Sequence, residues 1–443
     1  MKNIPWQNRL IIAFVLIATV LRFYGIASSP PGFYVDEAVG AANVLCIHQT
    51  GSDLSSHSLP LFSQGLGKGY YTAPYLYGEL FWTSIFGTSV TAFRTFLAFI
   101  TTLTLGFLFL WLRKRVSEKA AYIGILLASI SPWAFQFARI AWDPPLAPFF
   151  LMLALWFFDL EKKWNWIAGT LALALASYSY PAARLQAAVL LILIPGFAFR
   201  SKIKSLVLFG LSMIPMVWYT IKDPNFTVRT KMLILWSGHP MNPYRNDSFF
   251  ELIGDFLKQV SEHLTPTFLF VSGDQNLRHS SQSVGMMSWP EGLLLTLGIF
   301  FCIGWFFRTK KKKEPSAKPT VYLALFLLTG AFLGLASASL TWEGAPHALR
   351  AIGAWPFFIL LAALVYDRIE AKFPKKLFFP QVFTGLCVLF AGYFYYHYFN
   401  TYPAIAQGWF QTEQNDPGLA YERMTRQGVS CETIQAGVKN GSF

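Results

Sequence analysis

Eleven long apolar segments limit the folds open to this sequence more than any other feature. A helix needs about 20 mostly apolar residues to cross the roughly 30 Å hydrocarbon core of a bilayer. Only 13% of the 443 residues are charged, about half the usual share of a soluble domain, which excludes a soluble domain and a disordered chain. We therefore expect an all-α polytopic membrane protein. The predicted spans are roughly residues 9–27, 91–112, 119–138, 144–160, 164–181, 183–199, 204–221, 291–307, 319–340, 349–366 and 377–399.

The positions of the basic residues predict which side of the membrane each loop occupies. If residues 73–87 do not cross, the side of the N-terminus holds 21 of the 36 basic residues and six of the 23 acidic ones. That side then carries +15 and the other −2, which places the N-terminus in the cytoplasm and the C-terminus outside. The net charge of +13 is thus a topology signal and argues little for nucleic-acid binding. Segment 73–87 is short and contains Glu79, so we expect a helix lying in the outer interface.

The connections between spans predict one transmembrane domain at 1–400, followed by a short extracytoplasmic tail at 401–443. Two outer loops, 28–90 and 222–290, are long enough to form an active-site face, since long loops without structure are uncommon unless they are functional. A cleaved signal peptide is the alternative for the N-terminal span, although Arg22 within the apolar run argues against it. Cys46 and Cys431 both lie outside, which leaves a disulfide open.

Charged residues recur where the predicted spans meet the outer face. Ionisable groups near bilayer depth are costly, so they usually face a cavity or a partner. Several such groups at one level suggest an outward-facing polar pocket. The segments concerned are 30–38, 135–143, 178–184, 272–280 and 343–350.

The order of these motifs resembles that of the GT-C glycosyltransferases, which use lipid-linked donors. The first span is followed by the turn Pro30-Pro31-Gly32 and then by the pair Asp36-Glu37. Within this class the sequence is most similar to the branch of protein O-mannosyltransferases and lipid A aminoarabinose transferases, over roughly residues 10–400. Further matches are Ser131-Pro132-Trp133 through Asp143, the Tyr-x-Tyr-x-x-x-Arg segment ending at Arg184, Gly273 through His279, and His347 through Gly353.

The resemblance implies a mannosyltransferase-like enzyme that moves a sugar from a polyprenyl-phosphate donor to a hydroxyl-bearing acceptor, with inversion. The acceptor class is left open between protein, lipid and cell-envelope glycan, and nucleic acid is not expected as a partner. The implied location is the plasma (inner) membrane, with the active site on the extracytoplasmic side. A polytopic transporter or flippase for a lipid-linked sugar is the main alternative, and a non-catalytic membrane scaffold is a third.

Three acidic residues are the catalytic candidates that the resemblance implies: Asp36, Glu37 and Asp143. Asp36 is the expected base, because a carboxylate beside a hydroxyl can take its proton; its structural alternative is a helix N-cap. Glu37 is either a second polar contact or a first-turn complement to the helix dipole. Asp143 contacts sugar or pairs with Arg139 four residues earlier. No cofactor is certain and a divalent metal is left open, with Asp36 and Asp143 as its only candidate ligands.

The donor phosphate needs cations, and the sugar needs polar and aromatic contacts. Lys68 corresponds loosely to the family's first-loop lysine, although the Pro-Pro that follows in the family is missing here. For each arginine the alternative is an interfacial side chain that snorkels to the headgroups. The expected substrate-binding residues are Lys68, Arg139, Tyr178, Tyr180, Arg184, Asp274, Arg278, His279, His347 and Arg350.

Overall fold

The computed structural model describes residues 6–65, 69–160, 164–194, 199–309, 318–373, 379–411 and 419–439, and it is mostly helical. At least one helix overlaps each of the eleven segments that the sequence predicts as spans. The helices concerned are α1 (Trp6–Phe23), α4 (Val90–Leu112), α5 (Glu118–Ile130), α6 (Pro132–Ala138), α7 (Leu146–Phe158), α8 (Asn165–Ser179), α9 (Ala183–Leu193), α10 (Phe199–Lys222), α13 (Trp289–Thr309), α14 (Lys318–Ser339), α15 (Trp355–Lys372) and α16 (Phe379–Asn400).

Fewer of these helices meet the length and composition of a membrane span than the eleven expected. Among the described residues, five do so: Val90–Leu112, Ser201–Lys222, Val321–Ser339, Ile352–Lys372 and Pro380–Asn400. A sixth candidate span is formed if α5 and α6 are counted together, and the angle between these two helices is 52°. Pro132 at the start of α6 explains the bend, because proline cannot donate the backbone hydrogen bond that would continue α5. The other spans remain predictions.

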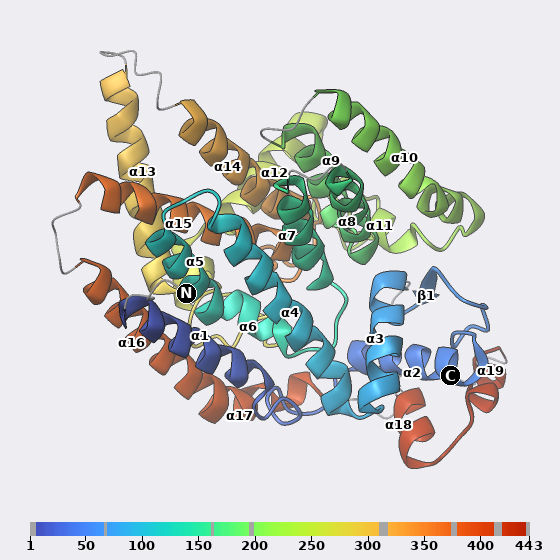
Figure 1. Ribbon diagram of the computed structural model, residues 1–443. Helices are drawn as coiled ribbons and strands as arrows, with labels where there is room; N and C mark the ends of the chain where they lie inside the picture. The colour runs from blue at the N-terminus through green and yellow to red at the C-terminus, as the bar shows by residue number, and fades with distance from the viewer. Residues whose placement is uncertain are drawn as a thin grey trace.

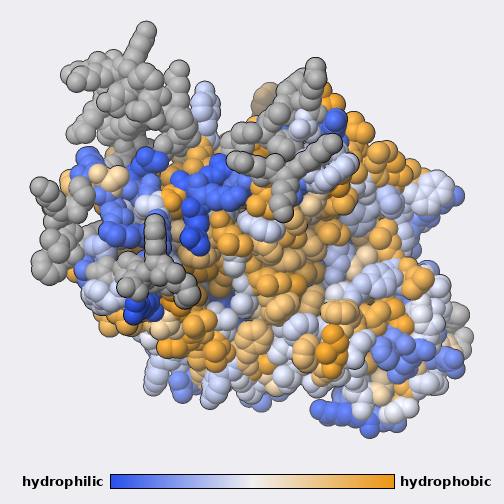
Figure 2. Space-filling model, viewed as in Figure 1, coloured by the Kyte–Doolittle hydropathy of each residue, from blue (hydrophilic) through white to orange (hydrophobic). Residues whose placement is uncertain are grey.

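The helices form a bundle that buries a large apolar core (Figure 1). Helix α7 packs between α4 and α8, while α15 contacts α5, α13 and α14. Figure 2 shows hydrophobic side chains gathered over the middle of the molecule. Hydrophilic ones lie at two ends, over the α4–α5 connection and over the C-terminal helices. This distribution fits a protein embedded in a bilayer with both ends of its bundle in water.

The first outer loop folds into two helices and a short hairpin. Helix α2 (Val35–Thr50) comes first, β1 (Phe62–Gln64) pairs antiparallel with β2 (Tyr70–Thr72), and α3 (Ala73–Phe86) follows directly. Helix α3 covers the segment expected as an interfacial helix, and it packs on α2, α4 and α8. Its Glu79 is fully buried, and neither carboxyl oxygen has a hydrogen-bond partner among the residues that the structure describes.

The second outer loop contains α11 (Val228–Leu233), α12 (Phe249–Glu262) and the π-helical turn η2 (Thr267–Val271). A capping box between Ser248 and Glu251 starts α12. The polar and apolar faces of this helix are arranged in the opposite way to those of a helix on the surface of a soluble protein. Gln259 is buried against the protein, whereas Phe250 is 82% and Leu257 57% exposed. Helix α12 packs on α14, one of the helices that meet the criteria of a span.

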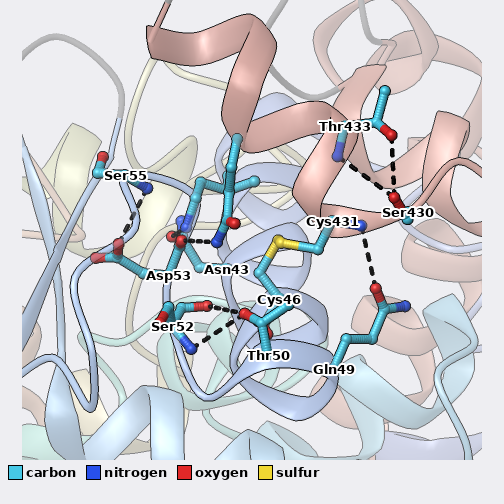
Figure 3. The surroundings of a disulfide bond; sticks show 12 residues. Asn43, Cys46, Gln49, Thr50, Ser52, Asp53, Ser55, Ser430, Cys431 and Thr433 are labelled. Carbon is cyan, nitrogen blue, oxygen red and sulfur yellow. Dashed lines mark hydrogen bonds between the residues drawn. A yellow bond between two sulfur atoms is a disulfide. The ribbon is translucent and has the colours of Figure 1, made fainter.

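The C-terminal tail folds back onto the first outer loop. It forms α17 (Tyr402–Ala406), the 3-10 turn η5 (Gln407–Trp409), α18 (Leu419–Arg426) and α19 (Cys431–Lys439), and α18 and α19 both pack on α2. Cys46 of α2 and Cys431 of α19 form the disulfide that the sequence left open (Figure 3). The Cys431 N–H also donates to the Gln49 side chain at 3.2 Å. Helices α18 and α19 are therefore part of the core cluster around α2, while Tyr402, Ala406 and Phe410 pack in the main core of the bundle.

Candidate active site

A cavity of about 760 Å³ lies among the two outer loops and the outer ends of the bundle helices. This is the size of a typical ligand pocket. Nine residues that were expected in the site line this cavity: Asp36, Asp143, Tyr180, Arg184, Asp274, Arg278, His279, His347 and Arg350. Lys68 lies outside the described residues.

Asp36 is held at the cavity by the first turn of α2. Tyr34 is the N-cap of that helix, so the expectation that Asp36 might be the cap is wrong. The Tyr71 hydroxyl donates to the Asp36 carbonyl at 2.5 Å and fixes the backbone. Burial raises the pKa of the Asp36 carboxyl, while the charges of Arg229 and Arg278 act in the opposite direction. These cations favour the ionised carboxylate that a base requires.

Glu37 does not line the cavity, although the sequence placed it among the catalytic candidates. It is fully buried, and its two oxygens accept from the Arg94 guanidinium, from the Tyr34 N–H at 3.1 Å and from the Ala141 N–H at 2.8 Å. Arg94 also donates to the carbonyls of Ile26, Pro30 and Gly32. Glu37 and Arg94 therefore join α2, α4 and the turn that precedes Asp36. Their role is to position the site.

Asp143 lines the cavity together with Asp36, and the expected ion pair with Arg139 is not formed. The cause is that α6 ends at Ala138, so the two residues do not share a helix face. Burial, with the nearby negative charge of Asp36 as a smaller cause, raises the pKa of Asp143 to about 8. Burial thus raises the pKa of both cavity carboxyls, and the charges of Arg229 and Arg278 oppose the rise at Asp36.

Arg139 does not reach the cavity. All five of its N–H groups donate to backbone carbonyls, those of Leu21, Arg22, Tyr24 and, twice, Ser29, at 2.6 to 2.9 Å. The expected substrate contact is replaced by a structural role at the C-terminal end of α1, where helical carbonyls lack intrahelical partners. The sequence could not reveal this, because nothing in it shows which carbonyls lie nearby.

Four arginines that line the cavity supply positive charge. Arg184 donates only weakly, to the Ser177 carbonyl at 3.4 Å, whereas Arg350 is bound to Thr341 and Glu343. Arg278 uses its Nε on the Trp409 carbonyl at 2.7 Å. The fourth is Arg229 of α11, which the sequence analysis missed because it lies in a loop without a recognisable motif.

Asp274, His279 and His347 form one polar cluster on the cavity wall, and their ligand atoms lie within 4.8 Å of one another. This is the group among the described residues that could hold a metal, and it differs from the expected pair Asp36 and Asp143. His279 Nδ1 lies 2.9 Å from Asp274 Oδ2, which also accepts the Ala348 N–H at 2.8 Å. A metal bound by Asp274 and His279 would have to replace these hydrogen bonds.

The two tyrosines of the Tyr178–Arg184 segment have different surroundings. Tyr180 lines the cavity, but Tyr178 donates to the Ser212 carbonyl at 2.9 Å and stacks on Phe62. Tyr178 therefore supports a lining residue and is not itself on the cavity wall. Tyr34, Tyr71 and Trp142 also line the cavity and were not predicted as site residues. Aromatic residues are common throughout this sequence, so composition gave no signal for them.

No protein-family model and no curated protein matches the sequence. Among solved structures, the crystal structure of ArnT from Cupriavidus metallidurans bound to undecaprenyl phosphate aligns with a TM-score of 0.51 and 15% identity. The alignment covers 97% of this chain and 70% of ArnT. The chain therefore shares the overall fold of ArnT. The apo state of the same ArnT aligns over 94% of this chain and 67% of ArnT, with a TM-score of 0.48 and 14% identity. The alignment with the undecaprenyl-phosphate-bound structure supports the resemblance of the motifs at the level of the fold.

Proposed function

We propose that this protein is an integral-membrane glycosyltransferase that moves a sugar from a polyprenyl-phosphate donor to an acceptor hydroxyl on the outer face. The observation that carries the proposal is the joint presence of Asp36, Asp143 and four arginines on one cavity. A carboxylate can accept the hydroxyl proton, and arginines suit a phosphate. The GT-C fold, and the undecaprenyl phosphate bound to ArnT, agree with such a donor.

In the proposed reaction, Asp36 takes the proton of the acceptor hydroxyl as that oxygen attacks the anomeric carbon. The bond between the anomeric carbon and the phosphate oxygen breaks, and its electron pair leaves with the polyprenyl phosphate. Attack from the face opposite the phosphate inverts the anomeric carbon. Arg278 and Arg229 face the charge that develops on the leaving phosphate, which lowers the barrier electrostatically.

Asp143 has a different part in this reaction. With a pKa raised to about 8, it is mostly protonated at neutral pH and can donate a hydrogen bond to the sugar.

The outer face is the proposed side of the cavity. The disulfide between Cys46 and Cys431 agrees with this, because disulfides persist outside the cytosol. Cys46 lies on α2, the helix whose first turn brings Asp36 to the cavity, and α19 with Cys431 packs on α2. The distribution of basic residues gives the same orientation from independent information. In a bacterium, this would be the periplasmic side of the inner membrane.

Sugar transfer by membranes that carry the wild type or Asp36→Asn tests the proposal. Mass spectrometry of glycolipids and glycans from cells with and without the protein first identifies the product; mannosyl and aminoarabinosyl donors are the first to try. We expect Asp36→Asn to abolish product while Glu422→Gln, an exposed change on α18, leaves it unchanged. Full activity of Asp36→Asn would remove Asp36 as the base. Flux of a lipid-linked sugar across sealed vesicles without a covalent product would instead indicate a transporter.

A further inference from the structure

Arg278 is held in the cavity by two aromatic rings from distant parts of the chain. Its Cζ lies 3.8 Å from the centroid of the Tyr34 ring and 5.3 Å from that of the Trp409 ring. Its Nε donates to the Trp409 carbonyl at 2.7 Å. Among the described residues, its Nη1 and Nη2 donate to no protein acceptor. These two groups form the edge of the guanidinium that can bind an anion with two parallel hydrogen bonds.

Trp409 is itself fixed, because the segment that carries it is bound to the cavity wall on several sides. We name residues 402–411 the C-terminal strap. The Tyr402 hydroxyl donates to the Leu277 carbonyl at 2.6 Å and accepts from Gln136 Nε2 at 2.7 Å. The same Gln136 amide donates to the Arg278 carbonyl at 2.9 Å. The strap thus holds both the backbone and the side chain of Arg278.

The other end of the strap fits against the turn before Asp36. Phe410 is fully buried, and its carbonyl lies so close to Gly32 that a β-carbon there would collide with it. Gly32 also has a φ of +79°, a conformation that side chains disfavour. Trp409 lies one residue before this anchor and does not line the cavity, and its side chain is 38% exposed.

We propose that Trp409 is a positioning residue that orients the Arg278 guanidinium for the phosphate of the lipid donor. The inference rests on the proposed function and extends it to the tail of the chain. A flexible arginine loses conformational freedom when it binds an anion, so a side chain held in advance binds more tightly. Stacking against an aromatic ring also favours the flat guanidinium. Trp409 acts through Arg278 and touches no reacting atom.

Binding of undecaprenyl phosphate to the purified full chain in detergent tests this role, with undecaprenol as the probe that lacks the phosphate. We expect Trp409→Ala to weaken undecaprenyl phosphate binding about 5-fold, the order expected for one cation–π contact. Undecaprenol binding should not change. Trp409→Phe, which keeps a ring and the backbone, should recover most of the affinity. Trp164→Ala, a change at an exposed tryptophan outside the cavity lining, is the matched control.

A double-mutant cycle separates positioning from a general structural effect. In an Arg278→Lys background the planar group is gone, so Trp409→Ala should then weaken binding by less than about 2-fold. Two outcomes would overturn the positioning role while leaving the donor class intact. One is that Trp409→Ala weakens undecaprenyl phosphate binding by the same factor with Arg278 as with Lys at that position, and the other is that Trp409→Ala leaves the affinity unchanged. A wild type that does not distinguish undecaprenyl phosphate from undecaprenol would overturn both. Thermal unfolding of each variant identifies any that is misfolded. If Trp409→Ala is misfolded, the affinity of Trp409→Phe for undecaprenyl phosphate tests the positioning role instead.

Discussion

Glu37 and Arg94 form a bidentate ion pair in which Nε lies 2.8 Å from Oε1 and Nη2 lies 2.8 Å from Oε2. Both side chains are fully buried. Glu37 follows Asp36 directly in the sequence, yet the two carboxylates have different surroundings. Asp36 lines the cavity, whereas Glu37 is buried and bound to Arg94.

Substitutions at these two acids should therefore have different effects. Glu37→Gln leaves the Arg94 charge buried without its partner, and breaking one side of a buried pair costs about 3–5 kcal/mol of folding free energy. We expect a large fall in the unfolding temperature and loss of activity. Asp36→Asn should lose activity with little change in the unfolding temperature. An inactive Glu37→Gln protein with wild-type stability would show instead that Glu37 acts on the substrate.

The pH dependence of sugar transfer should report the two cavity carboxyls. Activity should rise with pH as Asp36 ionises and fall above about 8, where Asp143 loses its proton. Rates measured under kcat conditions between pH 5 and 9 check this. In Asp143→Asn, which keeps a hydrogen-bond donor, the decline above pH 8 should disappear. If that variant keeps the same decline, another group is responsible.

Glu79 should make stability fall as the pH rises. Burial, with the charge of Glu37 as a smaller cause, raises the pKa of this carboxyl well above its ordinary value. The folded state therefore retains the proton after the unfolded state has released it, so the protein loses stability from about pH 4.3 upward, by at most about 1.4 kcal/mol per pH unit. Glu79→Gln should unfold at a higher temperature than the wild type at pH 8. Equal unfolding temperatures at pH 8 would show that Glu79 has a partner.

The exposed face of α12 should lie in the bilayer interface. Phe250, Ile253 and Leu257 point outward while Gln259 faces the protein, the reverse of a helix in water. A fluorophore on Leu257→Cys in nanodiscs should be quenched by doxyl lipids more than by iodide. The same label on Glu422→Cys of α18 should show the opposite preference. A label on Leu257→Cys that neither quencher reaches would indicate a protein partner on this face.

The helices could be predicted from the sequence because the requirement of the bilayer is local. A run of apolar residues is visible in the chain itself, and at least one helix overlaps each predicted segment. Charges at the outer helix ends also predicted much of the cavity, including Asp36, Asp143 and Arg278. These residues are conspicuous because ionisable groups at that level are costly.

The distinction between binding and structural arginines could not be predicted in this way. Arg139 and Arg278 both sit in motif segments, yet one donates all its N–H groups to carbonyls and the other leaves two nitrogens toward the cavity. Only the tertiary path of the backbone decides between them. Asp274, His279 and His347 were each expected in the site, but their convergence into one possible metal-binding group was not predicted, since His347 comes from a different loop.

The bond between Cys46 and Cys431 joins residues 385 positions apart, which has a consequence for biosynthesis. Cys46 is delivered across the membrane early in translation, long before its partner is synthesised. Helix α2, with Asp36 at its start, must wait for α19 before the elements that surround it are complete. The α2 core cluster is therefore completed last, and a ribosome that stalls after α16 would release a bundle in which Cys46 has no partner.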